Sequence, residues 1–136
     1  MASAPSFISV PKTPTASFAN ADATAFKPIY TGGALGSRID TLFASNSDPA
    51  NAYVLQLALT KSSVDYVIGE VAVPMGAGTN GSAKSVAVLN QTDIPGLAYT
   101  ENGALYLEVD IILRARVKST VAGSNTVQVC GVGGDY

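Results

Sequence analysis

The sequence contains no histidine and no tryptophan, and its only cysteine is Cys130. Without histidine, the chain has neither a Ser-His-Asp triad nor a Cys–His nucleophile pair. A lone cysteine forms no intramolecular disulfide, and Cys130 lies in the strand-like run TVQVCGV, where a buried, unreactive thiol is expected. Because these catalytic residues are missing, we expect a protein that is not an enzyme and that uses no cofactor.

Charged residues are also scarce. They make up 13% of the chain, whereas soluble domains typically have ~25%. The eight Lys and Arg residues are scattered, apart from Arg114, Arg116 and Lys118, and the net charge is −2, so direct binding of nucleic acid is not expected. A chain with so few charges is expected to bury part of its surface against other chains, including copies of itself in a homodimer or homotrimer.

Long apolar runs are absent from the sequence as well. No window approaches the ~18 consecutive apolar residues of a membrane helix. The first ten residues, MASAPSFISV, lack the basic start and the apolar centre of a signal peptide. We therefore expect no association with membranes and a protein that is made and kept in the cytosol.

Two segments indicate ligand sites only weakly. The loop GAGTNGSAK has glycines followed by Lys84, but Ser82 stands where a phosphate-binding loop needs lysine, and strand-like runs flank the loop on both sides. Glu108 and Asp110 are spaced to share one face of a strand about 7 Å apart, as a weak cation site would require. We favour a mobile loop for the first segment and a solvated or salt-bridged pair for the second, so no metal site is predicted.

The first 25 residues differ in composition from the rest of the chain. Alanine, serine, threonine and proline supply 17 of them, and Lys12 and Asp22 are their only charged residues. Such a segment cannot build a core of its own, and its prolines favour an extended path. We predict an extended N-terminal arm over residues 1–25 and a domain over residues 26–136. The arm is either a disordered tail or a segment that orders on a partner through its apolar anchors, which are Phe7, Ile8, Val10 and Phe18.

From Phe26 onward, short β-like runs alternate with turn signals. The runs include AYVLQLALTK, DYVIGEVAV, SVAVL and SRIDTLFA, and in the last of these Ile39, Thr41 and Phe43 are expected to share a face. Between the runs lie turns such as SNSDPAN and Asn102-Gly103. Seven or eight strands without a helical period predict an all-β fold, a single antiparallel β-sandwich or jelly roll.

The longest run is LYLEVDIILRARVK, residues 105–118. Its odd positions are apolar throughout, which predicts one strand of 14 residues with its odd face in the core. Because strands usually have about five or six residues, this strand is expected to bend, to cross between sheets or to extend to another subunit.

The even positions of this run form a charged ribbon, which we predict to be a subunit contact. Its contact residues are Tyr106, Glu108, Asp110, Ile112, Arg114 and Arg116. In a two-fold antiparallel pairing, the two acids of one copy would face the two arginines of the other. The alternative is a solvent-facing sheet with weak ion pairs within the chain.

From Gly36 to the end, the order of features resembles the small decoration, or cement, proteins of tailed-bacteriophage capsids. The segments that carry the resemblance are SRIDTLFASNSDPANAYVLQLAL, YVIGEVAVPMGAG and PGLAYTENGALYLEVDIILRARVKSTVAGSNTVQVCGVGGDY. They share with that family an Asp-Pro loop between the first two core strands, a proline-led turn into the longest strand, and a Gly-Gly-Asp-aromatic end. In this chain, that end is Gly133, Gly134, Asp135 and Tyr136.

The resemblance implies a jelly-roll-like virion protein on the outside of an icosahedral phage head. Such a protein would bridge and stabilise subunits of the major capsid protein, after assembly in the cytoplasm of the host bacterium. Two other classes stay open: another virion component on a similar sandwich, such as a tail, fibre or head-completion protein, and a carbohydrate-binding module or sandwich enzyme. The lack of tryptophan and histidine makes the last class the least favoured, because sugar platforms favour exposed aromatic rings.

Overall fold

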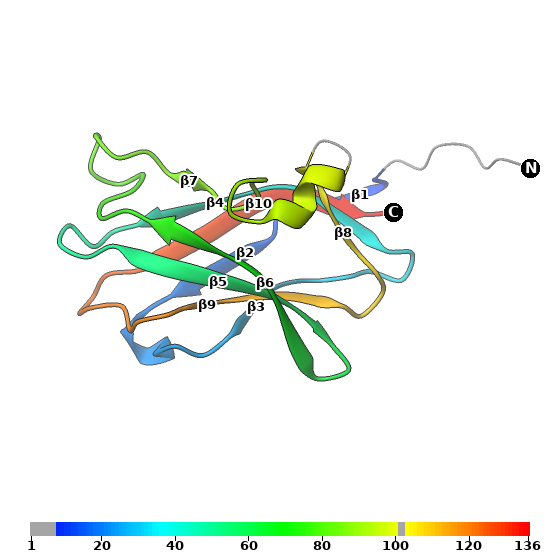
Figure 1. Cartoon of the computed structure of the whole chain (residues 1–136), viewed down its shortest axis with the longest axis horizontal. Helices are drawn as coiled ribbons and strands as arrows, with labels where there is room; N and C mark the ends of the chain where they lie inside the picture. The colour runs from blue at the N-terminus through cyan, green and yellow to red at the C-terminus, as the bar shows by residue number, and fades with distance from the viewer. Residues whose placement is uncertain (1–7, 101–102) are drawn as a thin grey trace, which may run out of the picture.

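In a computed structural model, which describes residues 8–100 and 103–136, the chain forms two antiparallel β-sheets packed face to face (Figure 1). The first sheet contains β1 (Val10–Lys12), β2 (Thr15–Phe18), β4 (Ser37–Asn46), β7 (Val86–Ala87), β8 (Leu105–Leu107) and β10 (Val127–Asp135). The second contains β3 (Lys27–Thr31), β5 (Tyr53–Lys61), β6 (Val64–Val73) and β9 (Ile112–Val117). Within the described residues, the helical segments are two 3-10 turns, η1 (Asn20–Asp22) and η2 (Pro95–Tyr99). The prediction of an all-β sandwich is confirmed.

The strand order of the two sheets is that of a jelly roll. The first sheet runs β1–β10–β4–β7, with β2 also paired to β10 and β8 to β4, and the second runs β3–β9–β5–β6. Along the chain, β2 to β5 alternate between the sheets, and β7, β9 and β10 alternate again after the β5–β6 hairpin. This double wrapping of the chain gives the two Greek keys of a jelly roll, and it leaves β3 and β6 as the edges of the second sheet.

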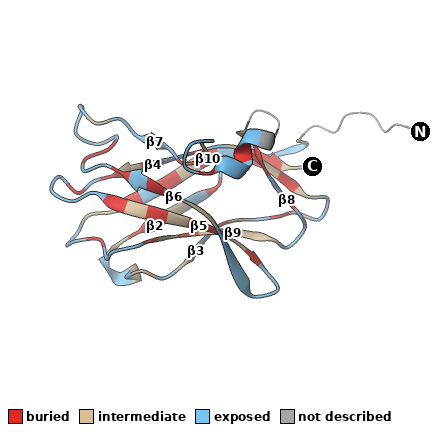
Figure 2. Cartoon of the chain, in the orientation of Figure 1, coloured by how far each residue is buried: buried red, intermediate tan, exposed pale blue. Residues whose placement is uncertain are grey.

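The core lies between the sheets and is built from alternate residues of the long strands (Figure 2). Leu55 and Leu57 of β5, and Leu113 and Val117 of β9, are fully buried, as a period of two predicts. Burial of each such side chain contributes about 1.5–3 kcal/mol. Other fully buried side chains of this core are Phe18, Ile39, Val73, Val88, Val121 and Val127.

The alternation in β4 changes phase within the strand. Ile39 faces the core, but Phe43, four residues later, is 42% exposed. The cause is a β-bulge opposite Val132 and Gly133 of β10, which leaves one extra residue in β4 and moves the following side chains to the other face. The prediction that Ile39, Thr41 and Phe43 share a face is therefore wrong.

Residues 105–118 do not form one strand. β8 belongs to the first sheet and β9 to the second, so the chain crosses between the sheets at residues 108–111. Asp110 has a φ of 64°, in a region that aspartate tolerates better than most residues, and its N–H donates to Gly32 O at 3.1 Å. A Cβ added to Gly32 would lie 2.0 Å from Glu108 O, so the turn requires glycine there. The prediction of a single long strand is wrong, and the crossing between sheets is the expected alternative that is observed.

Much of the segment expected to be an arm pairs with the sandwich. β1 and β2 both lie beside β10, on the side away from β4. Phe18, at the end of β2, is fully buried in the core of its own chain, so its predicted role as an exposed anchor is wrong. Ile8 is half-buried and Val10 is 46% exposed. Phe7 lies outside the described residues, and ordering of the arm on a partner stays a prediction.

Glycines allow the neighbours of the C-terminal strand to approach closely. An added Cβ would lie 2.3 Å from Arg38 O at Gly133, and 2.3 Å from Val10 O at Gly134. A side chain at either position would therefore push β4 or β1 away from β10. The Gly-Gly pair singled out by the sequence thus has a packing role in this fold.

Candidate interaction surfaces

The basic half of the charged ribbon lies on the outer face of the second sheet, where partners in the same chain hold two of its cations. Arg116 Nε donates to Gln56 Oε1 at 2.9 Å, and its guanidinium lies 5.1 Å from the centroid of the Phe26 ring. Lys118 Nζ donates to Glu70 Oε1 at 2.8 Å, and this bond lowers the pKa of Glu70. These contacts are the ones expected of a solvent-facing sheet with pairs inside the chain.

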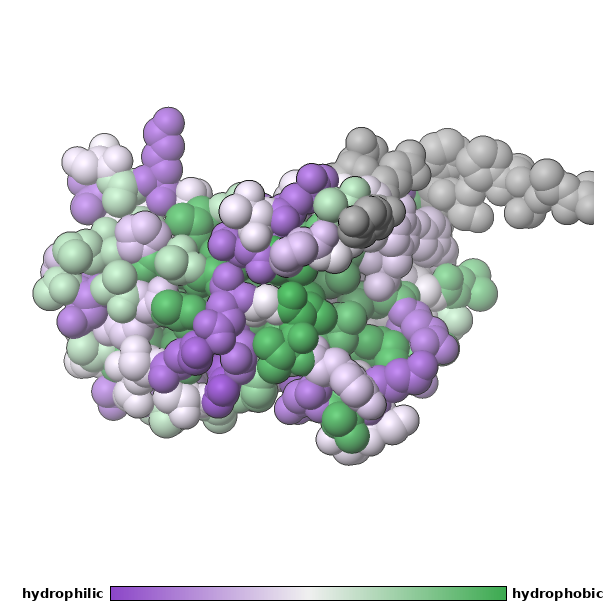
Figure 3. All heavy atoms as spheres, viewed as in Figure 1, coloured by the Kyte–Doolittle hydropathy of each residue, from purple (hydrophilic) through white to green (hydrophobic). Residues whose placement is uncertain are grey.

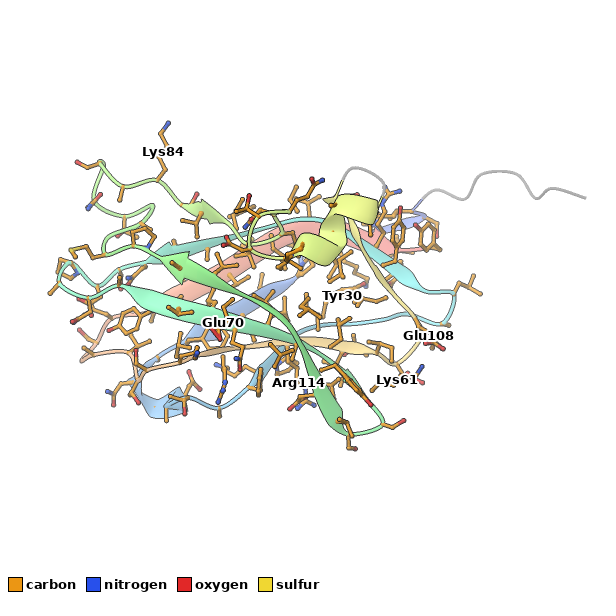
Figure 4. The ribbon with its side chains drawn as sticks, in the orientation of Figure 1. Tyr30, Lys61, Glu70, Lys84, Glu108 and Arg114 are labelled. Carbon is orange, nitrogen blue, oxygen red and sulfur yellow. The ribbon has the colours of Figure 1, made fainter. Side chains whose placement is uncertain are left out.

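The acidic half of the ribbon lies at the crossing between the sheets. Glu108 Oε2 is 3.2 Å from Lys61 Nζ in an exposed ion pair, and Figure 4 shows this pair well apart from Arg114. Tyr106 lies on β8 in the first sheet, whereas Arg114 lies on β9 in the second. The predicted contact residues therefore do not share one face. The predicted pairing with a second copy required one continuous strand over residues 105–118, and the structure has no such strand.

Three of the predicted contact residues instead line a hollow at the tip of the β5–β6 hairpin, which we call the polar pocket. Its volume is about 370 Å³, and its lining is Thr60, Ser62, Ser63, Asp65, Asp110, Ile112 and Arg114. The sheet register brings them together, because Thr60 pairs with Asp65 on one side and with Ile112 on the other. Sequence reasoning missed this pocket because the hairpin and the crossing turn are distant along the chain.

A second hollow, which we call the apolar groove, lies between the β5–β6 hairpin and β8. Its volume is about 270 Å³, and its lining is Leu59, Lys61, Tyr66, Tyr106, Glu108 and Ile111. Tyr66 and Tyr106 are 57% and 43% exposed. Figure 3 shows hydrophobic side chains gathered in the middle of this side of the molecule. The groove is therefore a half-open apolar surface with an ion pair at its rim.

The hairpin that borders both hollows projects from the body of the sandwich (Figure 1). Val64, Tyr66 and Val67 of β6 lie near its tip and are all about half exposed. Within the described residues, no strand pairs with the outer edge of β6. An exposed apolar edge of this kind can pair with, or pack against, another chain.

The outer face of the first sheet also carries exposed apolar side chains. Phe43 pairs with Cys130 across β4 and β10, and the nearby Val132 is 57% exposed. Cys130 is half-buried on this outer face, so the prediction of a buried thiol is wrong. A shallow hollow of about 330 Å³ lies alongside, between β2 and β10.

Asp48 is a buried carboxylate that holds the loop between β4 and β5. It accepts hydrogen bonds from Tyr53 Oη at 2.7 Å, from Asn51 Nδ2 at 3.0 Å and from Ala50 N at 2.8 Å. These bonds, with that of the tyrosine first, hold the pKa of Asp48 at about 2. Tyr53 Oη also accepts a hydrogen bond from Ala122 N at 2.9 Å, which fixes a second loop.

Asp135 holds the C-terminal end in a similar way. Ser37 Oγ and Tyr30 Oη both donate to Asp135 Oδ1 at 2.5 Å, and both bonds lower the pKa of the carboxyl. Burial, together with the bond to this carboxylate, raises the pKa of Tyr30 to about 12. The bonds join β3 of the second sheet to β4 and β10 of the first, so the role of Asp135 in this fold is structural.

Over residues 8–100 and 103–136, no three His, Cys, Asp or Glu side chains are grouped so as to hold a metal ion. No helix in the same part of the chain has the length and apolar character needed to cross a membrane. A scan against protein-family models and a search of curated proteins found no match to the sequence. The fold, its surfaces and the resemblance in the sequence are therefore the features that bear on function.

Proposed function

We propose that the chain is a decoration protein on the outside of an icosahedral phage head, where it bridges and stabilises subunits of the major capsid protein. The resemblance of the sequence to cement proteins motivates this proposal. The jelly-roll strand order agrees with the fold that the resemblance implies. Because sandwiches of this kind host many functions, the fold alone does not carry the proposal.

The observation that carries the proposal is the exposed apolar surface on the β5–β6 hairpin. Val64, Tyr66 and Val67 project beside the apolar groove, on a chain with only 13% charged residues. Contiguous apolar patches on soluble proteins commonly mark surfaces that another protein covers. We assign the major capsid protein to this hairpin as its partner.

The proposal has two further parts. Copies of the chain associate as a homodimer or homotrimer, through contacts other than the symmetric ribbon pairing, which the crossing at residues 108–111 removes. The protein is assembled in the cytoplasm of the host bacterium and resides on the capsid surface in the virion.

Cryo-electron microscopy of phage heads tests the proposal. Heads of the phage that encodes the chain are compared with heads from a deletion of its gene. The expected result is sandwich-sized density outside the shell, over contacts between capsid subunits, that is present only in the first sample. Heads that lack the protein should also break at a lower temperature. Identical maps and identical thermal stability would contradict the proposal.

A second candidate is another virion component, such as a tail, fibre or head-completion protein. The same hairpin surface favours it, because that surface fits a protein partner without specifying which one. Immunogold labelling of intact virions distinguishes the two functions. Labels spread over the head support the decoration protein, and labels confined to the tail or to the neck support the alternative.

A further inference from the structure

The polar pocket combines one guanidinium, two carboxylates and three hydroxyl groups in one hollow (Figure 4 labels Arg114). Its floor is buried, because Thr60 is only 7% exposed and donates its hydroxyl to Asp65 Oδ1. Its rim, formed by Ser62, Ser63 and Asp110, is exposed. The volume of about 370 Å³ lies within the range of ~300–1,000 Å³ that is usual for small-molecule sites.

Arg114 supplies the observation that points to a ligand. Its Nε is buried and has no hydrogen-bond partner within the described residues, although the side chain lines the pocket. A buried donor without an acceptor costs free energy, so native structures rarely leave one unpaired. Arg116, two residues along the same face of β9, has its Nε paired with Gln56. The terminal nitrogens of Arg114 make no hydrogen bond or ion pair with the described residues, so these nitrogens, and not the covered Nε, are free to donate to a ligand in the pocket.

The backbone around the pocket is held in unusual conformations. Ser62, Ser63 and Asp110 have φ values of 52°, 64° and 64°. Among the described residues, only one other non-glycine residue, Ala23, has a positive φ. Positive φ at Ser62 and Ser63 is the usual geometry of a two-residue hairpin turn, and this turn and the crossing at Asp110 define the shape of the rim.

The charges of the pocket select the chemical class of the ligand. The carboxylates of Asp65 and Asp110 repel an anion, and the guanidinium of Arg114 repels a metal cation, for which two carboxylates are also too few ligands to form a site by themselves. A neutral molecule with several hydroxyl groups is compatible with both the negative and the positive groups of the pocket, because a hydroxyl can donate to a carboxylate or accept from a guanidinium. Ile112 offers an apolar wall to the C–H groups of such a molecule.

We propose that the polar pocket binds a neutral saccharide unit, with Arg114 and Asp65 as the principal contacts. Oδ2 of Asp65 and both carboxylate oxygens of Asp110 accept no hydrogen bond from the described part of the chain, so they are free to accept from sugar hydroxyls. This site lies on the outer face of the second sheet and does not depend on the proposed attachment to a phage head.

Titration of the full-length protein, followed by amide NMR spectra, tests the proposal. The probes are D-glucose, D-galactose and N-acetyl-D-glucosamine, with calcium chloride and inorganic phosphate as separate arms. The expected result is saturable shifts confined to residues 60–65 and 110–114 with at least one sugar. Shifts at these residues with calcium or phosphate alone would overturn the proposal in favour of an ion. Absence of sugar shifts at these residues would also overturn it.

Variants show whether the sugar occupies this pocket. Asp65→Asn and Arg114→Met should each weaken sugar binding by about tenfold or more, equivalent to ~1.4 kcal/mol. The matched control is Arg116→Met, which removes an arginine of the same strand outside the pocket and should leave affinity unchanged. Thermal melts check that each variant folds. If Arg114→Met does not fold, the result for Asp65→Asn decides the test. Unchanged affinity in a folded Asp65→Asn would overturn the proposal.

Discussion

Single polar residues decide how the loops of this sandwich are held. The run SNSDPAN was predicted to be a turn from its composition, and the structure has a loop there, between β4 and β5. The burial of Asp48 beneath Tyr53 was not predictable, because the alternation in β5 identifies Tyr53 only as a core residue. Asp48 and Tyr53 are only five residues apart, but the hydrogen bond between them depends on how the loop folds back on itself, which the alternation of apolar residues does not contain.

Asp48 is expected to make the stability of the protein fall in acid. Its folded pKa of about 2 lies below the ordinary value of 3.8, so its contribution is complete above about pH 4 and is lost as the pH falls toward 2. Asp48→Asn should lower the melting temperature at neutral pH and flatten its decline over this acid range. Asp93→Asn, which changes an exposed carboxylate, should match the wild type in both respects. Parallel pH profiles for wild type and Asp48→Asn would contradict this role.

Gly133 is expected to be intolerant of any side chain. The methyl group of Gly133→Ala would lie 2.3 Å from Arg38 O, so β4 and β10 must separate locally, at a cost of about 1–3 kcal/mol. Gly96→Ala is the matched control, because no atom lies within 4 Å of its added Cβ. Urea denaturation measures both changes. A difference between the two variants smaller than the experimental error would show that the close approach of the strands is unimportant.

At the scale of the element, a period of two predicts which residues are buried but does not reveal where a strand is interrupted. In residues 105–118, both sheets receive apolar odd residues, so the pattern continues across the turn at Asp110. The interruption depends on Gly32, which is far away in the sequence and leaves room for Glu108 O. The bulge in β4 could not be predicted from the sequence of β4 for the same reason, because it depends on the register of β4 against the distant strand β10.

Phe18 tests whether β2 is part of the folded core. Phe18→Ala should lower the free energy of unfolding by about 3–5 kcal/mol, because the ring is fully buried. Val10→Ala, in the neighbouring strand β1, should change it by no more than about 0.5 kcal/mol, because Val10 is 46% exposed. Urea denaturation followed by circular dichroism measures both values. A small effect at Phe18 would mean that the segment is a detachable arm, as its composition predicted.

At the scale of the whole molecule, the structure makes the β5–β6 hairpin, and not the charged ribbon, the candidate contact surface. Low charge content predicts association only as a class of behaviour and indicates no particular surface, and association itself stays a prediction. The charges of the ribbon predict a subunit contact, but Arg116 and Lys118 have partners in their own chain. The sequence predicts only an ordinary strand at the tip of β6, and the exposure of the tip follows from the length by which the hairpin projects beyond the sandwich (Figure 2).

The hairpin surface gives the last prediction, which concerns attachment to phage heads. Val67→Lys places a charge in the middle of the exposed apolar edge of β6, where lysine opposes strand pairing and apolar packing. Val132→Lys is the matched control, because Val132 is similarly exposed but lies on the outer face of the first sheet. Both variants should keep the stability of the wild type within about 0.5 kcal/mol, since both positions are on the surface. Co-sedimentation with heads that lack the protein should show loss of binding for Val67→Lys alone. Loss of binding only for Val132→Lys would show that the contact with the head lies on the first sheet. Full binding by both variants would exclude both surfaces as the main contact.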